Sequence, residues 1–299
     1  MKKYLILLSG LVASSFVFTS LCRAADDDVE QKYIDAAVNL VDAGEYRLAL
    51  KVLKDCDRPF ADALRMEAYN EVGRTRKAIR YGVEYLDALG KQDMSEGGIS
   101  MSSYVTADVE DILDKDWKYA ADLIRKRLAE QSCNPQLEMM LGSLYQINGH
   151  YRKAIGQYDK TLEYCSSIGL DGYGTNWLCY WKSSCYYALD DYDNAIRTMS
   201  KAVEANSGKD YYQLCRRGFY YMQAGMFEEA MEDYTKATAV NSYSADAYFG
   251  KCAVLYKQGR LEEARVEYEK GIVVDPEMEC METEPDDLLD IVARFSRGI

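Results

Sequence analysis

Histidine is the side chain most often used as a general acid or base near neutral pH, and this chain has only one, His150. A Ser-His-Asp or Cys-His arrangement would have to use that residue. His150 follows Asn148 and Gly149 at a predicted turn between two helices, and no nucleophile motif lies beside it. We therefore interpret it as a solvated turn residue, with a catalytic base or a metal ligand as the less favoured alternatives.

The other reactive residue types also lack a catalytic pattern. Gly169, Gly172 and Gly174 follow no apolar strand and precede no Lys-Ser or Lys-Thr pair, so they do not form a phosphate-binding loop. Aspartate and glutamate total 49, but most of them stand in pairs on predicted outer helix faces, where they serve solvation. We predict that the protein is not an enzyme and that it has no cofactor and no metal site.

Eight cysteines follow Cys22, and an even number favours disulfides in an exported protein. Their spacing contains no Cys-x-x-Cys pair and no zinc-binding pattern. Cys215 and Cys252 fall within predicted helices at packing positions, which is typical of buried thiols. Cys165 and Cys179 flank one irregular connection and could form a bridge, although buried thiols are the favoured interpretation.

The segment 1–24 has the order of a secretory signal peptide. Lys2 and Lys3 precede an apolar run over 4–21, and Ala24 stands before an acidic cluster. We predict cleavage after Ala24, and therefore a periplasmic or secreted protein with no stable membrane insertion. An uncleaved anchor is the alternative. Lipidation at Cys22 is disfavoured, because lipoprotein signals usually place a residue smaller than Leu21 before that cysteine.

The chain is strongly acidic. Lysine and arginine total 36 against 49 acidic residues, a net charge of −13, and removal of the signal peptide leaves 33 − 49 = −16. Such a surface repels phosphate backbones and anionic membranes, so we expect no nucleic-acid partner. The acidity either maintains solubility, which is the favoured interpretation, or attracts a basic protein.

A repeated pattern defines the elements that carry these residues. The motif Gly-x-(Phe or Leu)-Glu-Glu-Ala occurs at 225–230 and again at 259–264, so Ala230 and Ala264 hold the same place in successive units. Their separation equals the period of about 34 residues that is typical of stacked helical hairpins. These residues resemble the tetratricopeptide repeat family. The resemblance covers 33–276 and is strongest from 137 onward.

The resemblance implies an all-α, right-handed solenoid of about seven helical hairpins. The pattern predicts helices at 245–257 and 261–274 in the last repeat, with Ala264 at the close helix contact. The period slips twice, which predicts long loops at 90–103 and 166–176. Residues 285–295 form an amphipathic pattern that predicts a capping helix. The expected organisation is a signal peptide (1–24), degenerate hairpins (25–134), regular repeats (135–276) and a cap (277–299).

In this family the first helices of the repeats line a concave groove, and an aromatic stripe on those helices suggests where a partner binds. Tryptophan, tyrosine and arginine dominate binding hot spots. The same aromatics could instead pack between neighbouring repeats. The predicted groove residues are Trp177, Tyr180, Trp181, Tyr187, Tyr212, Arg216, Phe219, Phe249, Tyr256 and Lys257.

We therefore predict a non-catalytic scaffold or adaptor that binds a protein or peptide in its groove in the bacterial envelope. Two alternatives stay open. The protein could be a structural component that assembles with copies of itself or with an envelope complex, or a glycan-binding accessory protein whose aromatic wall stacks on sugars. The sequence does not identify the partner.

Overall fold

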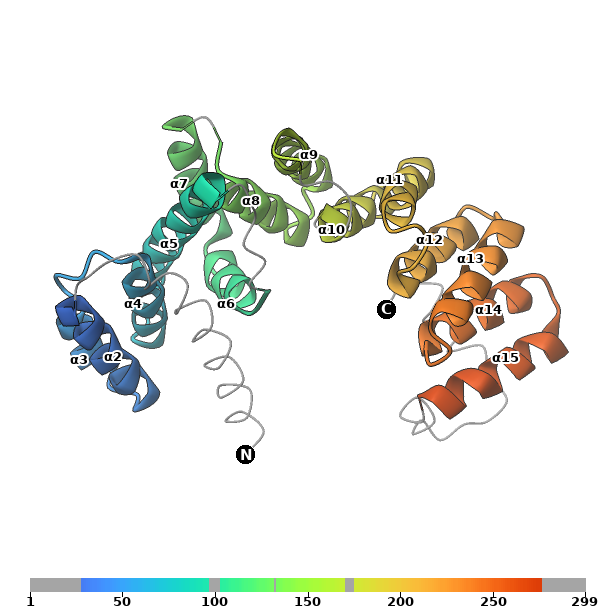
Figure 1. Ribbon diagram of the computed structural model, residues 1–299, viewed down its shortest axis with the longest axis horizontal. Coiled ribbons are helices and arrows are strands. Elements are labelled where there is room, and N and C mark those ends of the chain that lie inside the picture. Colours follow the sequence, from blue (N-terminus) through green and yellow to red (C-terminus); the bar gives the residue numbers. More distant parts are fainter. Residues whose placement is uncertain (1–27, 97–102, 132, 170–174, 276–299) are drawn as a thin grey trace. The chain divides into compact units, whose positions relative to one another are not determined.

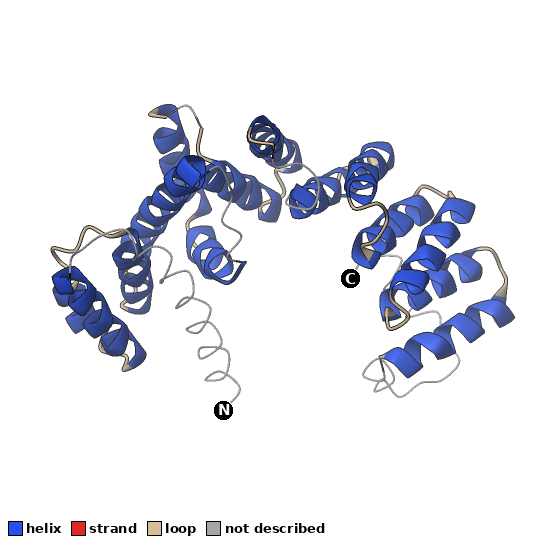
Figure 2. Cartoon of the chain, in the orientation of Figure 1, coloured by secondary structure: helices blue, strands red, loops and turns tan. Residues whose placement is uncertain are grey.

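The structure is a computed structural model that describes residues 28–96, 103–131, 133–169 and 175–275. Those residues form fourteen helices and no strand, as the repeat pattern predicts (Figures 1 and 2). The helices are α2 (Asp28–Asp42), α3 (Tyr46–Val52), α4 (Pro59–Glu71), α5 (Thr75–Glu96), α6 (Ser103–Asp114), α7 (Trp117–Ala129), α8 (Pro135–Ile147), α9 (Tyr151–Ser167), α10 (Asn176–Tyr187), α11 (Tyr192–Ala205), α12 (Tyr211–Gln223), α13 (Phe227–Val240), α14 (Ala245–Lys257) and α15 (Leu261–Val274).

The contacts divide the chain after Ile168 into two compact units. The first contains hairpins α2/α3, α4/α5, α6/α7 and α8/α9, and the second contains α10/α11, α12/α13 and α14/α15. The bounds of α14 and α15 agree with the two predicted helices. The boundary proposed at 134/135 rests on repeat regularity and stays a prediction.

The hairpins of the second unit turn at residues with left-handed backbone. Gly225 (φ 78°) and Gly259 (φ 76°) stand at the ends of α12 and α14, where glycine adopts this conformation without strain. Asp190 (φ 57°) takes the equivalent place after α10, which aspartate tolerates better than most residues. The spacing of these turns keeps the helices in register from one hairpin to the next.

Tyr234 of α13 fills the centre of the second unit. Its ring is 1% exposed, and it lies against Gly218 of α12 and Gly250 of α14. A Cβ at Gly250 would stand 2.2 Å from Cε1 of Tyr234, and one at Gly218 would stand 3.2 Å from Cζ. One tyrosine therefore joins its own hairpin to the next, and only glycine leaves space for it.

The first unit departs from the predicted arrangement at α5. The predicted loop at 90–103 is wrong in its first half, because α5 continues as a helix to Glu96. Gly90 lies inside that helix and makes room for Asn134, whose Oδ1 would stand 1.8 Å from a Cβ at Gly90. Gly90 is thus required for close packing against Asn134. Sequence reasoning interpreted it as a turn residue. The extra length lets α5 contact α6, α7 and α8.

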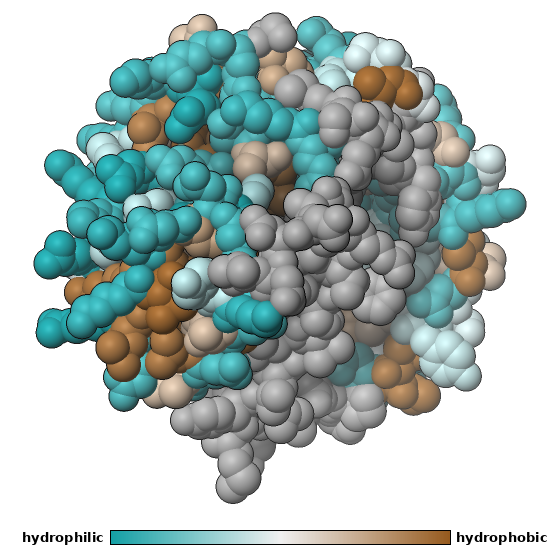
Figure 3. Space-filling view, turned by 60° about the vertical axis from the view of Figure 1, so that its left-hand side comes forward, coloured by the Kyte–Doolittle hydropathy of each residue, from teal (hydrophilic) through white to brown (hydrophobic). Residues whose placement is uncertain are grey.

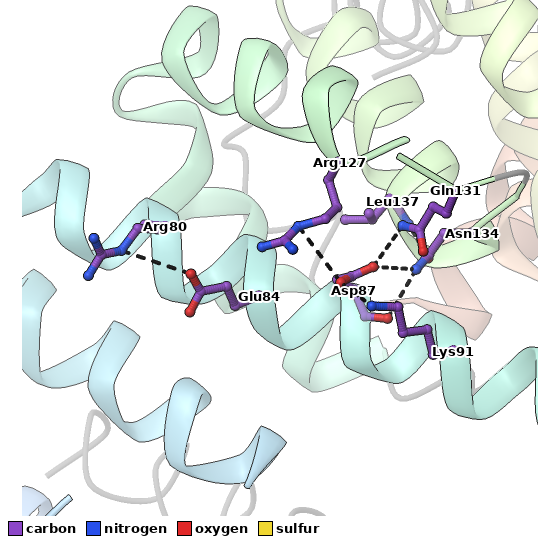
Figure 4. Close-up of polar contacts among 8 residues, drawn as sticks. All are labelled: Arg80, Glu84, Asp87, Lys91, Arg127, Gln131, Asn134 and Leu137. Carbon is purple, nitrogen blue, oxygen red and sulfur yellow. Dashed lines mark hydrogen bonds and ion pairs between the residues drawn. The ribbon is translucent and has the colours of Figure 1, made fainter. Parts of the chain in front are cut away.

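A polar cluster around Asp87 holds this junction (Figure 4). The Asp87 carboxylate is buried and accepts hydrogen bonds from Lys91 (2.8 Å), Gln131 (2.7 Å) and Asn134 (3.1 Å). Arg127 of α7 forms a longer ion pair with it (3.8 Å). Asn134 also caps α8 by accepting from the Leu137 amide (3.1 Å). The cluster therefore ties α5 to α7 and to the start of α8.

Several other predictions concern cysteines and chain ends. Cys165 and Cys179 are both buried and belong to different units, so the alternative of a bridge between them stays a prediction, and Cys215 and Cys252 are buried as expected. The signal peptide and the capping helix lie outside the described residues. None of the described helices combines the length and the apolar character needed to cross a bilayer. Figure 3 shows one side of the molecule, where polar residues dominate the described surface and apolar residues form separate patches.

Candidate functional site

The first helices of the last three hairpins, α10, α12 and α14, carry the predicted binding residues. Trp177 and Trp181 stand one turn apart on α10, and their rings meet edge to face with centroids 4.7 Å apart. Both side chains are half-buried. Because each ring restrains the other, the pair offers a rigid apolar surface that loses little conformational freedom on binding.

Arg216 of α12 is held against Tyr180 of α10. Its guanidinium carbon lies 4.4 Å from the centre of the tyrosine ring, and its Nη2 donates a hydrogen bond to the Tyr180 hydroxyl. Both residues are half-buried. The stacked arrangement fixes a positive charge on Tyr180, with cation–π attraction added to the hydrogen bond.

Tyr212 and Asp246 extend this polar edge to α14. Tyr212 is 60% exposed, and the pKa of its hydroxyl is raised mainly by the negative charge of Asp246. Partial loss of hydration raises the pKa of Asp246, and Arg216 opposes that rise. The three helices thus present adjacent aromatic, cationic and anionic groups at their N-terminal ends.

A hollow of about 290 Å³ lies between the N-terminal ends of α10 and α12. Two carboxamides, one carboxylate and three aromatic rings line it. They belong to Asn176, Trp177, Tyr180, Asp210, Tyr212 and Gln213. The Asp210 carboxylate caps α12 by accepting from the Tyr212 amide (2.9 Å). A hollow with this lining suits a small uncharged group that is partly apolar.

Two predicted wall residues do not reach the open face. Phe219 is 6% exposed and packs edge to face on Tyr187, with centroids 5.1 Å apart. Phe249 is 2% exposed and lies over Gly271 of α15, where a Cβ would stand 2.5 Å from its ring. Both phenylalanines therefore belong to the core. Phe219 packs between neighbouring repeats, as the alternative interpretation has it, whereas Phe249 packs within its own hairpin against α15. Tyr187 is half-buried above Phe219.

The last two predicted residues lie at the other end of α14. Tyr256 is half-buried and Lys257 is exposed. The tryptophan pair, Tyr180, Arg216 and Tyr212 are brought together at the N-terminal ends of the helices. Tyr256 and Lys257 stand about three turns along α14 from that end, at ~1.5 Å per residue, and so do not join this cluster.

Sequence reasoning missed Asn176 and Gln213. Gln213 is 6% exposed, and its counterparts at the same place in the repeats before and after it are Leu178 and Ala247, both 0% exposed. A carboxamide at a place where the other repeats bury apolar side chains is the signal that would have identified it.

The reactive side chains are held in unreactive states. Burial raises the pKa of the Cys185, Cys215 and Cys252 thiols to about 12, so they stay protonated. His150 is exposed, and its ring lies 5.2 Å from that of Trp117. Over the part of the chain that the structure describes, no three His, Cys, Asp or Glu side chains gather as metal ligands would.

The sequence is similar to tetratricopeptide repeats. The sequence model of that family matches residues 178–208 and 221–277. The chain is 25% identical over 271 residues to the TPR repeat-containing protein YpiA of Bacillus subtilis (strain 168), a match that covers 81% of this chain and 62% of YpiA. It is 32% identical over 91 residues to the small glutamine-rich tetratricopeptide repeat-containing protein 2 of Mycosarcoma maydis, covering 30% and 26% of the two chains. The chain therefore spans less than two thirds of these relatives.

Solved structures share the fold. BtubC from P. vanneervenii superposes with a TM-score of 0.54 at 17% identity, over 72% of this chain and 94% of that one. At this identity the likeness concerns the path of the backbone alone. It agrees with an all-α chain built from successive helical hairpins.

Proposed function

We propose that this chain, in which tetratricopeptide repeats occupy 178–208 and 221–277, is a non-catalytic scaffold that binds a protein or peptide on the first helices of its second unit. Tetratricopeptide repeat proteins act as protein-interaction scaffolds. Repeats of this kind bury their apolar residues between helices and leave an extended surface, which suits partner binding better than it suits an enclosed reaction centre.

The tryptophan pair of α10, together with the contact between Arg216 and Tyr180, is the observation that carries the proposal. Trp177 and Trp181 are held edge to face, and Arg216 is fixed on Tyr180. Tryptophan, tyrosine and arginine contribute most where a few side chains dominate an interface. Because these rings are already ordered, a partner loses less entropy when it binds them.

We also propose that the protein acts outside the cytoplasm. Support comes from the order of residues 1–24, in which two lysines precede an apolar run and Ala24 ends it. N-terminal sequencing of protein isolated from its native cells tests this point. A mature chain that starts at Ala25 is expected, and a chain that retains Met1 contradicts export by this route.

Display of random linear peptides against the full chain tests the binding surface. Trp181→Ala should weaken the selected peptides by about 2 kcal/mol, roughly thirtyfold in Kd, because a central tryptophan anchor is lost. The matched control is Tyr33→Ala, which removes a 50% exposed aromatic from the first unit. Circular dichroism must show that both variants are folded. If wild type selects no peptide, or if Trp181→Ala binds as tightly as wild type, this surface is not the site.

The last described helix favours self-association as a second candidate function. α15 exposes three aliphatic side chains, Leu261 (54%), Val266 (50%) and Val273 (81%). Light scattering of the full chain tests this candidate. A dimer or larger species that Val273→Glu returns to a monomer supports it, and a monomeric wild type at high protein concentration removes it.

A further inference from the structure

Gln213 occupies an unfavourable place for a carboxamide. It is 6% exposed, and among the described residues neither its Nε2 nor its Oε1 has a hydrogen-bond partner. A buried amide left without partners destabilises the fold by about 1–3 kcal/mol. Leu178 and Ala247, at the equivalent places in the neighbouring repeats, show that the fold itself needs no polar group there.

Asn176 repeats the anomaly on the facing helix. Both polar atoms of its carboxamide are shielded from water and lack a partner within the described part of the chain. Asn176 and Gln213 line the same hollow, together with the rings of Trp177, Tyr180 and Tyr212. Two residues that line one hollow thus carry four unmet polar atoms, which indicates a hydrogen-bond partner that is not among the described residues.

The chemistry of that partner follows from what the four atoms need. Two of them donate and two accept. A carboxylate only accepts, and it would also be repelled by Asp210, which lines the hollow. An ammonium only donates. A carboxamide carries donors and an acceptor in one plane, so it can pair with both protein amides and lie flat against an aromatic ring.

The size of the hollow limits how much of a partner enters. Sites for whole small molecules start near ~300 Å³, and this hollow measures about 290 Å³. It therefore has room for a side chain of a partner that binds across α10 and α12.

We infer that the hollow accepts one asparagine or glutamine side chain of the bound segment, and that its carboxamide pairs with those of Gln213 and Asn176. This assignment rests on the proposed function, since it names the residue that anchors the peptide. The tryptophan pair supplies the apolar contact beside it, and the hollow supplies the sequence preference.

Thermal unfolding of the free protein gives the first test. Gln213→Met keeps the size of the side chain and removes both unmet polar atoms, so Tm should rise by about 2–4 °C. Leu214→Met on the same helix is the matched control and should not raise Tm, because it replaces one buried apolar side chain by another. An unchanged or lower Tm for Gln213→Met means that its hydrogen bonds are already made, and overturns the inference.

Peptide selection gives the second test and separates the two proposals. Peptides selected by wild type should share an asparagine or glutamine, and those selected by Gln213→Met should lose that preference. If peptides are selected without a shared amide position, the scaffold function stands and this inference fails. If wild type selects none, the scaffold function fails as well.

A double-mutant cycle then measures the pairing directly. Replacing the shared peptide amide by methionine, or Gln213 by methionine, should each weaken binding about ten- to hundredfold, and the two changes together should cost no more than one alone. Independent losses overturn the pairing. Tryptophan fluorescence with neutral monosaccharides is the counter-test: saturable binding that is lost in Gln213→Met assigns the hollow to a sugar and overturns the inference.

Discussion

Two junctions between neighbouring hairpins are held by different kinds of contact, one by an aromatic ring packed on glycine and the other by a buried carboxylate. In the second unit, Tyr234 is inserted between Gly218 and Gly250, and its ring fits closely against both glycines. In the first unit, the buried Asp87 carboxylate gathers Lys91, Gln131 and Asn134 around it (Figure 4). The Tyr234 junction of the second unit joins consecutive helices of a regular array. The Asp87 junction of the first unit joins α5 to helices that come after α6 in the chain.

The difference follows from the spacing of the repeats. Where the period stays regular, each helix meets the same neighbours, so a ring and a glycine are enough to fix the register. Where the period slips, α5 grows to 22 residues and meets both α7 and the start of α8. The first backbone amides of α8 need an acceptor there. Asn134 accepts from the Leu137 amide, and Asp87 in turn accepts from the side chain of Asn134.

The largest effect is expected for Gly250→Ala. The new methyl would stand 2.2 Å from the Tyr234 ring, so the ring or the helix must move. The free energy of unfolding of the second unit should therefore fall by about 3 kcal/mol. Gly156→Ala is the control. No atom lies within 4 Å of that position in α9, so the same change there should stabilise by roughly 0.5–1 kcal/mol. Urea unfolding measures both, and equal effects at the two sites would contradict the packing role of Gly250.

Asp87→Ala should have the next largest effect, and it should fall on the first unit. Asn134 is fully buried and would keep only the backbone carbonyl of residue 87 as an acceptor, and Gln131 would lose its partner, so we expect destabilisation of about 2 kcal/mol. Native-state hydrogen exchange should show faster exchange in α5 and α8 and unchanged exchange in α13. Asp122→Ala, which removes a 71% exposed carboxylate paired with Arg125, is the control and should change little. Loss of protection in α13 would show that the two junctions are not independent.

Arg217→Lys sharpens the comparison, because the second unit also contains a buried ion pair. Arg217 donates from Nε and Nη2 to the two oxygens of Asp233, each at 2.7 Å, within the α12/α13 hairpin. Lysine keeps the charge and loses the paired geometry, so we expect a loss of about 1 kcal/mol. Thermal unfolding should register a small fall in Tm. A fall as large as that of Gly250→Ala would show that the paired hydrogen bonds of the guanidinium, rather than ring packing, fix this unit.

The smallest effect is a pH dependence that differs between the units. Burial raises the pKa of Glu84, Glu110 and Glu138 in the first unit above the ordinary value of 4.5. The folded form therefore binds these protons more tightly, and the stability they contribute is present at low pH and is lost as pH rises through the raised values.

In the second unit, Lys236 and Arg260 lower the pKa of Glu232 and Glu263, so their contribution persists above 4.5 and is lost only at lower pH. Burial raises the pKa of Asp246 in the second unit as well, but the first unit has more carboxyls of this kind, so between pH 7.5 and 5 it should gain stability relative to the second. Hydrogen exchange followed across that range measures the difference, and parallel changes in both units would contradict it.

The periodic parts of the fold were predictable, and the slipped part was not. The bounds of α14 and α15 follow from apolar spacing and from Gly259, because both signals are local. Gly90 misled the prediction, since glycine can mean either a turn or a close approach, and Asn134, much later in the chain, decides which. Trp177 and Trp181 were predicted as members of one aromatic stripe, and their rings lie together. Phe219 and Phe249 share their pattern and are buried, because Tyr187 and Gly271 supply packing surfaces that the sequence does not place beside them.

The sequence by itself determined that the chain is helical, that its last repeats follow a regular period and where their helices begin and end, because hydrogen bonding within a helix and turning at glycine depend on neighbours in the chain. Only the tertiary structure decided which aromatic rings stay exposed, which glycine makes room for a neighbouring side chain and which carboxamides line a hollow without a partner among the described residues. Those outcomes depend on contacts between helices far apart in sequence, where a change of one methyl group alters what fits.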